Sequence, residues 1–119
     1  MDCIFCKIIN GEIPSKKIYE SDNMLAILDL NQQTKGHTLI IPKKHIEDFT
    51  KLDEKTLKEM FDVAANLSQK LMQKLDRDGI HLGINYGSSQ DIKHVHMHLC
   101  PEKKEEDIDK IYDILKDDN

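Results

Sequence analysis

The spacing of apolar residues between Glu54 and Leu75 predicts one long amphipathic helix. Asp53 precedes it directly and is a suitable N-cap, because its carboxylate can accept hydrogen bonds from the unpaired amides of the first turn. Steps of three and four residues place the following apolar positions on one helical face: Leu57, Met60, Phe61, Ala64, Leu67, Leu71, Met72 and Leu75. The polar positions between them are expected to face solvent.

Two shorter helices are predicted at the ends of the chain. The segment CIFCKIINGEIP is typical of a short N-terminal helix that ends at Gly11, ahead of Pro14. Near the C-terminus, apolar residues again recur at helical spacing and predict a helix over about 104–116; these residues are Ile108, Ile111, Tyr112 and Leu115.

Five short runs rich in β-branched and apolar residues predict strands. They are KKIYE, MLAILDL, the stretch from His37 to Ile41 ended by Pro42, IHLGINY, and HVHMHLC ended by Pro101. The polar segments SDN, DRDG and GSSQD provide turns and loops. Strands in runs with one long helix between them predict an α+β fold with a mainly antiparallel sheet. We expect a single domain over residues 1–119, with a core over about 3–101.

Composition narrows the class of protein. Of 119 residues, 39% are hydrophobic and 33% charged, which is typical of a soluble globular chain. A net charge of −5 without a basic run argues against nucleic-acid binding. The longest apolar run is far shorter than the roughly 20 residues of a membrane helix, and three cysteines without an export signal favour reduced thiols. We therefore expect a cytoplasmic protein that contacts neither membranes nor nucleic acids.

The stretch HVHMHLCP carries His94, His96 and His98 at alternate positions. In a regular strand these residues share one face, and His94 and His98 lie about 13 Å apart, too far for one zinc ion to bind all three. A neighbouring pair can bind a metal, or the row can serve phosphoryl chemistry, in which one imidazole attacks phosphorus and another protonates the leaving group. The alternative is three histidines on a partly exposed sheet face.

Cys3 and Cys6 form a C-x-x-C pair at the start of the chain. A thioredoxin-like redox pair follows a strand, and no strand precedes this one. Metal ligation is therefore favoured over redox chemistry. The remaining alternative is two half-buried thiols of a helix.

The motifs GHTLIIPKKH, INYG and HVHMH together resemble the histidine triad (HIT) family of nucleotide hydrolases and transferases. The family signature alternates histidines with apolar residues, and residues 94–100 match it throughout. The resemblance extends from CIFCKIINGEIP to Pro101. It implies the HIT-like fold, a five-stranded mainly antiparallel sheet with one long helix and a short N-terminal helix, and it implies a homodimer. The C-terminal helix predicted from apolar spacing lies beyond the resemblance.

The resemblance also assigns roles at the reaction centre. It implies that His96 attacks the α-phosphorus of a purine nucleotide and carries the nucleotidyl group until water releases a nucleoside monophosphate. His98 matches the residue that assists the leaving group, and His37 the upstream histidine that supports the triad. Asn85 and Gln90 match side chains near the leaving group and the phosphate. Substrates of this kind include adenosine phosphoramidates and polyphosphate-type compounds.

The nucleoside end is implied in the same way. Asp29 matches the carboxylate that accepts hydrogen bonds from the ribose hydroxyls, with a strand-terminating turn cap as its alternative role. The wall around the base corresponds to Phe5, Ile8, Ile27 and Leu30. For Ile8 and Ile27, ordinary core packing is an equal alternative.

Members of the bacterial type of this family hold zinc through a C-x-x-C pair and two histidines. The corresponding residues are Cys3, Cys6, His45 and His94. Two thiolates and two imidazoles complete a tetrahedral set with no open position, which is typical of a structural Zn2+ rather than a catalytic one. The resemblance thus gives His94 a separate role from His96 and His98.

The loop NYGSSQD departs from the family pattern. It is about two residues short, Ser89 replaces a glycine, and Asp91 stands where a hydroxyl usually contacts phosphate. A carboxylate near a phosphate repels it, so the sequence predicts slow turnover or an altered leaving group, with Ser88 or Ser89 as substitute hydroxyls. The alternative function is a non-catalytic nucleotide-binding or zinc-stabilised interaction module.

Overall fold

The computed structural model describes residues 3–103 and 108–116. Its helices and strands are, in chain order, α1 (Ile4–Ile9), β1 (Lys17–Glu20), β2 (Met24–Leu28), β3 (Thr38–Pro42), α2 (Glu54–Lys74), β4 (Gly79–Ile84), β5 (Met97–Glu102) and α3 (Ile108–Lys116). Short 3-10 turns, η1 (Phe49–Lys51) and η2 (Gly87–Ser89), lie before α2 and before β5. As predicted, Asp53 caps α2, and its carboxylate accepts a hydrogen bond from the Thr56 amide.

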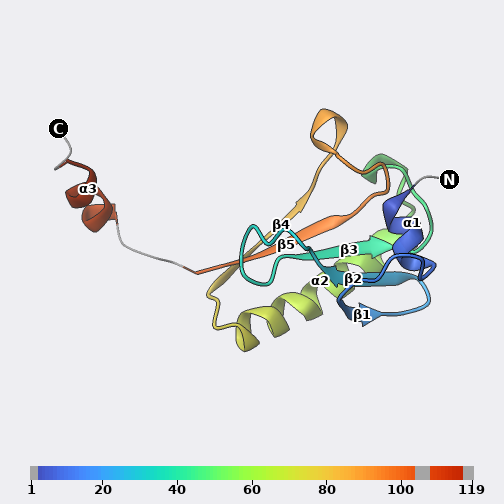
Figure 1. Ribbon diagram of the computed structural model, residues 1–119, viewed down its shortest axis with the longest axis horizontal. Helices are drawn as coiled ribbons and strands as arrows, with labels where there is room; N and C mark the ends of the chain where they lie inside the picture. The colour runs from blue at the N-terminus through green and yellow to red at the C-terminus, as the bar shows by residue number, and fades with distance from the viewer. Residues whose placement is uncertain (1–2, 104–107, 117–119) are drawn as a thin grey trace.

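The five strands form one sheet in the order β1-β2-β3-β5-β4, and every neighbouring pair is antiparallel. The predicted α+β class and antiparallel sheet are therefore confirmed. Figure 1 shows β5 lying between β3 and β4, with α1 close to the end of the sheet at which β5 begins. This topology brings the residues that precede β5 to the middle of the sheet, beside residues from the start of the chain.

The two faces of the sheet bury different side chains. One face packs against α2 through a cluster of Met24, Ala26, Ile40, Met60, Val63, Ala64, Leu67, Leu71, Met97 and Leu99. The other face packs against α1 through Cys3, Phe5, Ile8, Leu25, Ile27, Leu39 and Ile41. The alternation within β2 and β3 follows from the two-residue period of a strand. The N-terminal helix is therefore fixed on the sheet face opposite α2.

Both ends of β5 differ from the sequence prediction. β5 begins at Met97 rather than His94, so that His94 and His96 lie in the segment before it, which the Val95 amide ties to the Ile46 carbonyl at 2.7 Å. Pro42 is the last residue of β3, as predicted, whereas Pro101 lies inside β5, which extends to Glu102. β3 pairs with β5 only as far as Leu99, so the β3-facing edge of β5 is unpaired beyond that residue. Pro101, which has no N–H to donate, is tolerated at this unpaired edge.

The C-terminal helix is present as Ile108–Lys116, while positions 104–107 of the predicted range lie outside the described residues. It buries none of its side chains, and Figure 1 shows it apart from the sheet. Of the helices in the described part of the chain, none is long and apolar enough to cross a membrane.

Candidate active centre and metal site

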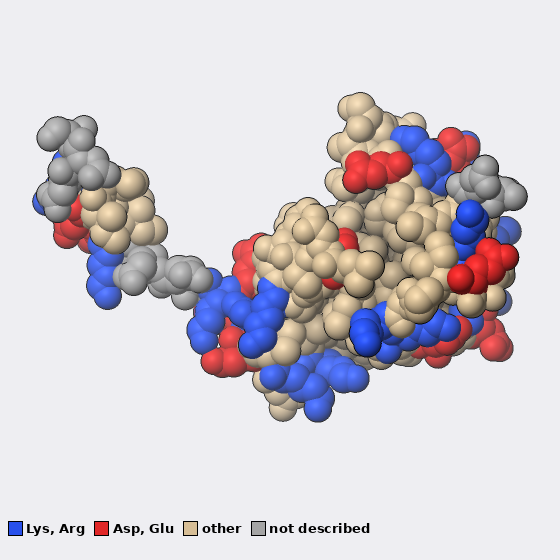
Figure 2. All heavy atoms as spheres, viewed as in Figure 1, with Lys and Arg blue, Asp and Glu red and all other residues tan. Residues whose placement is uncertain are grey.

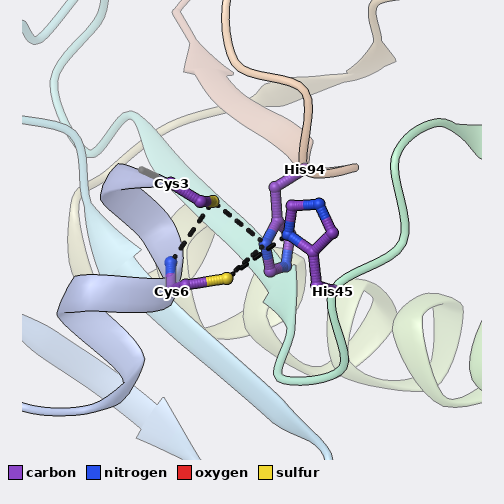
Figure 3. Close-up of side chains that lie close together, drawn as sticks. All are labelled: Cys3, Cys6, His45 and His94. Carbon is purple, nitrogen blue, oxygen red and sulfur yellow. Dashed lines mark hydrogen bonds between the residues drawn. The ribbon is translucent and has the colours of Figure 1, made fainter. Parts of the chain in front are cut away.

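Four predicted metal ligands converge beside the start of α1. Cys3 Sγ lies 3.5 Å from His94 Nδ1, and Cys6 Sγ lies 3.3 Å from His45 Nδ1 and 3.6 Å from His94 Nδ1. Figure 3 shows the two thiols, from α1 and the residue before it, pointing toward the two imidazoles. All four ligand atoms lie within 4.8 Å of one another. The structure thus brings together residues 91 positions apart in the chain.

These separations fit a tetrahedral zinc ion. With Zn–S near 2.3 Å and Zn–N near 2.05 Å, a tetrahedral angle places sulfur and nitrogen about 3.6 Å apart. The measured 3.3–3.6 Å lies close to that value. Burial and the nearby Cys3 thiol raise the pKa of Cys6, so the Cys6 thiol is costly to ionise without a cation beside it. His94 is fully buried, and its Nε2–H donates to the Pro42 carbonyl at 2.7 Å, which leaves Nδ1 as a lone-pair donor toward the thiols.

His96 is held as a neutral imidazole with one nitrogen available. Its Nδ1–H donates to the His94 carbonyl at 2.8 Å, so Nε2 carries the lone pair. Burial lowers the pKa of His96, and Asp91 and Asp29 oppose the shift only in part. The Phe5 ring packs edge-on against it, with ring centroids 4.9 Å apart. This arrangement fixes the His96 ring and favours its unprotonated form.

His98 is joined to His37 and Asp29 in a chain of polar contacts. The Gln33 amide donates to His37 Nδ1 at 3.5 Å, so His37 Nε2–H donates to His98 Nδ1, 2.9 Å away. His98 then carries its proton on Nε2, which is buried and has no hydrogen-bond partner among the described residues. Burial first, and then His96 and His37, lower the pKa of His98. Asp29 Oδ2 lies 3.7 Å from His37 Nδ1.

A cavity of about 370 Å³ adjoins these imidazoles. Of the predicted site residues, Phe5, Ile8, Ile27, Asp29, Leu30, His96 and His98 line it. The structure adds lining residues that the sequence reasoning missed: Ile4, Ile13, Pro14, Ser15, Leu28, Asn31, Gln33, Leu39 and Ile92. Several of these follow α1, and only the folding of that segment over β2 brings them here.

Asn85 and Gln90 do not line this cavity. Asn85 is exposed and lies just past the end of β4. Gln90 is buried, and its side-chain amide donates to the carbonyls of Glu47 at 2.7 Å and Ile92 at 3.0 Å. In this conformation Gln90 anchors the loop before β5. Its predicted phosphate contact stays a prediction.

Asp91 does line the cavity, together with His96 and His98. Its charge acts to raise the pKa of both imidazoles. The carboxylate therefore faces the space in which a phosphate next to His96 would lie. The electrostatic conflict between this carboxylate and a bound phosphate stays a prediction.

Gln32 is a structural residue of the site that was not predicted from the sequence. Its Oε1 accepts from the amides of Gly36 and His37 at 2.8 and 3.1 Å, and its Nε2 donates to the carbonyls of Asp29 and His37 at 2.5 and 2.8 Å. One side chain thus closes the loop that carries Asp29 and His37. No residue spacing reveals such a role, because it depends on backbone groups.

The model of the HIT domain matches residues 10–105. The chain belongs to the HIT domain family. An uncharacterized HIT-like protein of Methanocaldococcus jannaschii is 45% identical over 101 residues, which cover 83% of this chain and 78% of the relative. HIT family members are nucleotide-binding proteins of the hydrolase and transferase kind. The fold and the row of histidines described above agree with membership of this family.

Two further similar proteins bear on the chemistry. The structure of a Zn-bound histidine triad family protein from Mycobacterium smegmatis matches with a TM-score of 0.84 and 36% identity, covering 91% of this chain and 80% of that one. The adenylylsulfatase HINT3 of Arabidopsis thaliana is 38% identical over 105 residues, covering 87% of this chain and 53% of the relative. The first HIT protein holds zinc, and the second is an enzyme.

Proposed function

We propose that this chain is a nucleotide hydrolase or nucleotidyltransferase that works through a nucleotidyl intermediate on His96. The main support for this proposal is that the imidazoles of His96 and His98 lie side by side at one cavity. His96 presents a lone pair on Nε2, and His98 presents an N–H that lacks a partner among the described residues, with ring centroids 5.0 Å apart. A nucleophile and a proton donor side by side are what phosphoryl transfer requires.

The proposed reaction has two steps. Once the His37–His98 pair beside Asp29 has taken up one proton from solvent, His96 Nε2 attacks the α-phosphorus, the bond to the leaving group breaks, and the His98 Nε2 proton passes to the leaving nitrogen or oxygen, which leaves His98 neutral. Water then attacks the same phosphorus, its proton returns to His98, and the nucleoside monophosphate and free His96 are released. Asp29 lines the cavity, and its proposed role is to accept hydrogen bonds from ribose hydroxyls. Phe5 and Ile8 form the apolar wall for a purine base.

Zn2+ has a structural role in this proposal. Cys3, Cys6, His45 and His94 form a closed set, so the ion would cross-link α1 and the segments before α2 and β5 rather than activate water. The His94 carbonyl accepts from His96, so the same residue links the metal site to the nucleophile. The ion would thus hold the nucleophile's tautomer in place without taking part in the reaction.

The natural substrate is proposed to be a purine nucleotide whose α-phosphate carries a good leaving group, such as a phosphoramidate or a mixed anhydride. The adenylylsulfatase relative supports this class. The test is turnover of adenosine phosphoramidate, adenylyl sulfate and diadenosine polyphosphate by the wild type and by His96→Ala. The proposal requires nucleoside monophosphate release from at least one substrate by the wild type and none by the variant.

Asp91 favours a second candidate, a nucleotide-binding module without efficient chemistry. Its carboxylate lines the cavity and opposes a bound phosphate. Wild-type binding of nucleoside monophosphate, with no turnover of any substrate in the panel, would favour this second function.

We also propose a homodimer formed through β4. This six-residue strand is at the edge of the sheet, and Leu82 on it is 39% exposed. An unpaired apolar edge strand is a site for pairing with another copy. Sedimentation velocity of the wild type and of Leu82→Lys would show a dimer that the substitution weakens.

A further inference from the structure

One helix covers only part of the sheet face on which it lies. Five strands at about 4.8 Å spacing are about 19 Å wide between the outer strands, whereas a helix is about 10–12 Å across. α2 has most of its contacts with β3, β5 and β4 and also packs against Met24 and Ala26 of β2, and an open groove lies beside it toward β1. A groove of about 300 Å³ runs there, with Ile18 and Leu28 from the strands on one side and Leu67, Leu71 and Leu75 of α2 on the other.

α3 is a helix with an unpartnered apolar face. Ile108, Ile111, Tyr112 and Leu115 fall on one side of it and are 80%, 43%, 63% and 61% exposed. Helices shorter than about 12–15 residues are marginal in water unless they are packed against something. α3 has nine residues and buries no side chain, so its own helical conformation needs a partner surface.

The end of β5 brings the chain to one end of this groove. Lys103 Nζ forms an ion pair with Asp76 Oδ2, just past the end of α2, at 2.8 Å. A Cβ placed on Gly36, which lines the groove, would lie 2.5 Å from Leu75 Cδ1 and 3.3 Å from Pro101 Cγ. Residues 104–107 span at most about 18 Å, and a nine-residue helix is about 14 Å long. α3 can therefore reach the groove of its own chain.

Charge also matches between the two surfaces. Lys35, Lys70 and Lys74 are among the residues that line the groove, and α3 carries Asp109 next to its apolar face, with Asp113 one turn further on in an ion pair with Lys116 at 3.1 Å. Figure 2 shows basic side chains gathered on the end of the body nearest to α3. A basic rim beside an apolar floor suits an amphipathic helix with an acidic flank.

We propose that α3 docks with its apolar face in the groove between α2 and the β1–β2 side of the sheet, in its own chain. The groove wall includes Gln32 and Gly36, which belong to the loop that Gln32 closes around Asp29 and His37. A docked α3 thus contacts the back of the loop that carries two candidate site residues. The inference rests on packing and charge alone and is independent of the proposed function.

The test uses a fluorescent probe in the full-length chain, which contains no tryptophan of its own. Tyr112→Trp places the probe on the apolar face, and Lys110→Trp is the matched control on the opposite side of the same helix. Docking predicts a blue-shifted, quencher-protected emission for the first variant and a solvent-like emission for the second. The shift should be unchanged on serial dilution, because docking within one chain is independent of concentration.

A second pair of variants locates the partner surface. Lys70→Glu with Lys74→Glu, added to Tyr112→Trp, should move the emission toward that of the exposed control, whereas Lys55→Glu with Lys58→Glu at the other end of α2 should not. Equal emission from positions 112 and 110 would overturn the proposal. A blue shift that vanishes on dilution would show that α3 docks on a second copy of the chain. A blue shift that is unchanged by the Lys70→Glu and Lys74→Glu substitutions would show that α3 docks on another surface. Each of these two results would also overturn the proposal.

Discussion

Removing zinc should lower the free energy of unfolding of the protein. Sulfur–nitrogen separations of 3.3–3.6 Å already match the tetrahedral edge, so little rearrangement opposes binding. At free zinc about 100 times Kd, binding to the folded state alone adds about 2.7 kcal/mol to the free energy of unfolding. For a chain of this length that corresponds to roughly 10 °C in Tm.

The assay is thermal unfolding followed by circular dichroism, with free zinc buffered in excess and then with EDTA. Cys6→Ser should unfold at the lower temperature in both conditions, because one ligand is lost. Cys100→Ser is the matched control: this cysteine is partly buried but lies outside the ligand set, so the variant should keep the full zinc dependence. Equal Tm of the wild type with zinc and with EDTA, or loss of the dependence in Cys100→Ser, would refute the reasoning.

The remaining predictions concern charge and packing around the cavity. Replacing Asp91 by Ser removes a carboxylate from the cavity, so KM for a nucleotide substrate should fall. Glu102→Ser is the control outside the cavity. An unchanged KM in Asp91→Ser would contradict the expected repulsion between the carboxylate and the phosphate. Burial lowers the pKa of His96 and His98 below the value in the unfolded chain, so the unfolded state takes up protons first as pH falls. Urea unfolding should therefore show a free energy of unfolding that decreases as pH falls below about 6.5 and is constant above that pH. Phe5→Ala should cost about 3–5 kcal/mol of stability, because its side chain is 3% exposed and packs on His96; a cost below 1 kcal/mol, measured in the same urea titrations, would refute this packing role.

Periodic and local features were predictable from the sequence. The helix predicted over Glu54 to Leu75 was found as Glu54–Lys74 with Asp53 as its cap, because an amphipathic stripe and an N-cap both act within a few residues. The four metal-ligand positions were predicted through family resemblance and are together in the structure.

Features that depend on distant backbone groups were not predictable. The strand was expected to begin at His94, but it begins at Met97, since the backbone of Val95 pairs with Ile46 in a loop instead of with a strand. Likewise, Gln90 matched a phosphate ligand by its place in the motif, yet its amide bonds to two backbone carbonyls, which no sequence pattern encodes.

The central claim is that His96 carries the nucleotidyl group, and acid-free mass spectrometry of the intact protein after brief mixing with adenosine phosphoramidate or adenylyl sulfate tests it most directly. Nδ1 of His96 is committed to the His94 carbonyl, so the adduct must form on Nε2. We expect a mass increase of one adenylyl group, located at His96 by fragmentation and absent from His96→Ala. Substrate turnover without any adduct on His96, or an adduct that survives in His96→Ala, would contradict it.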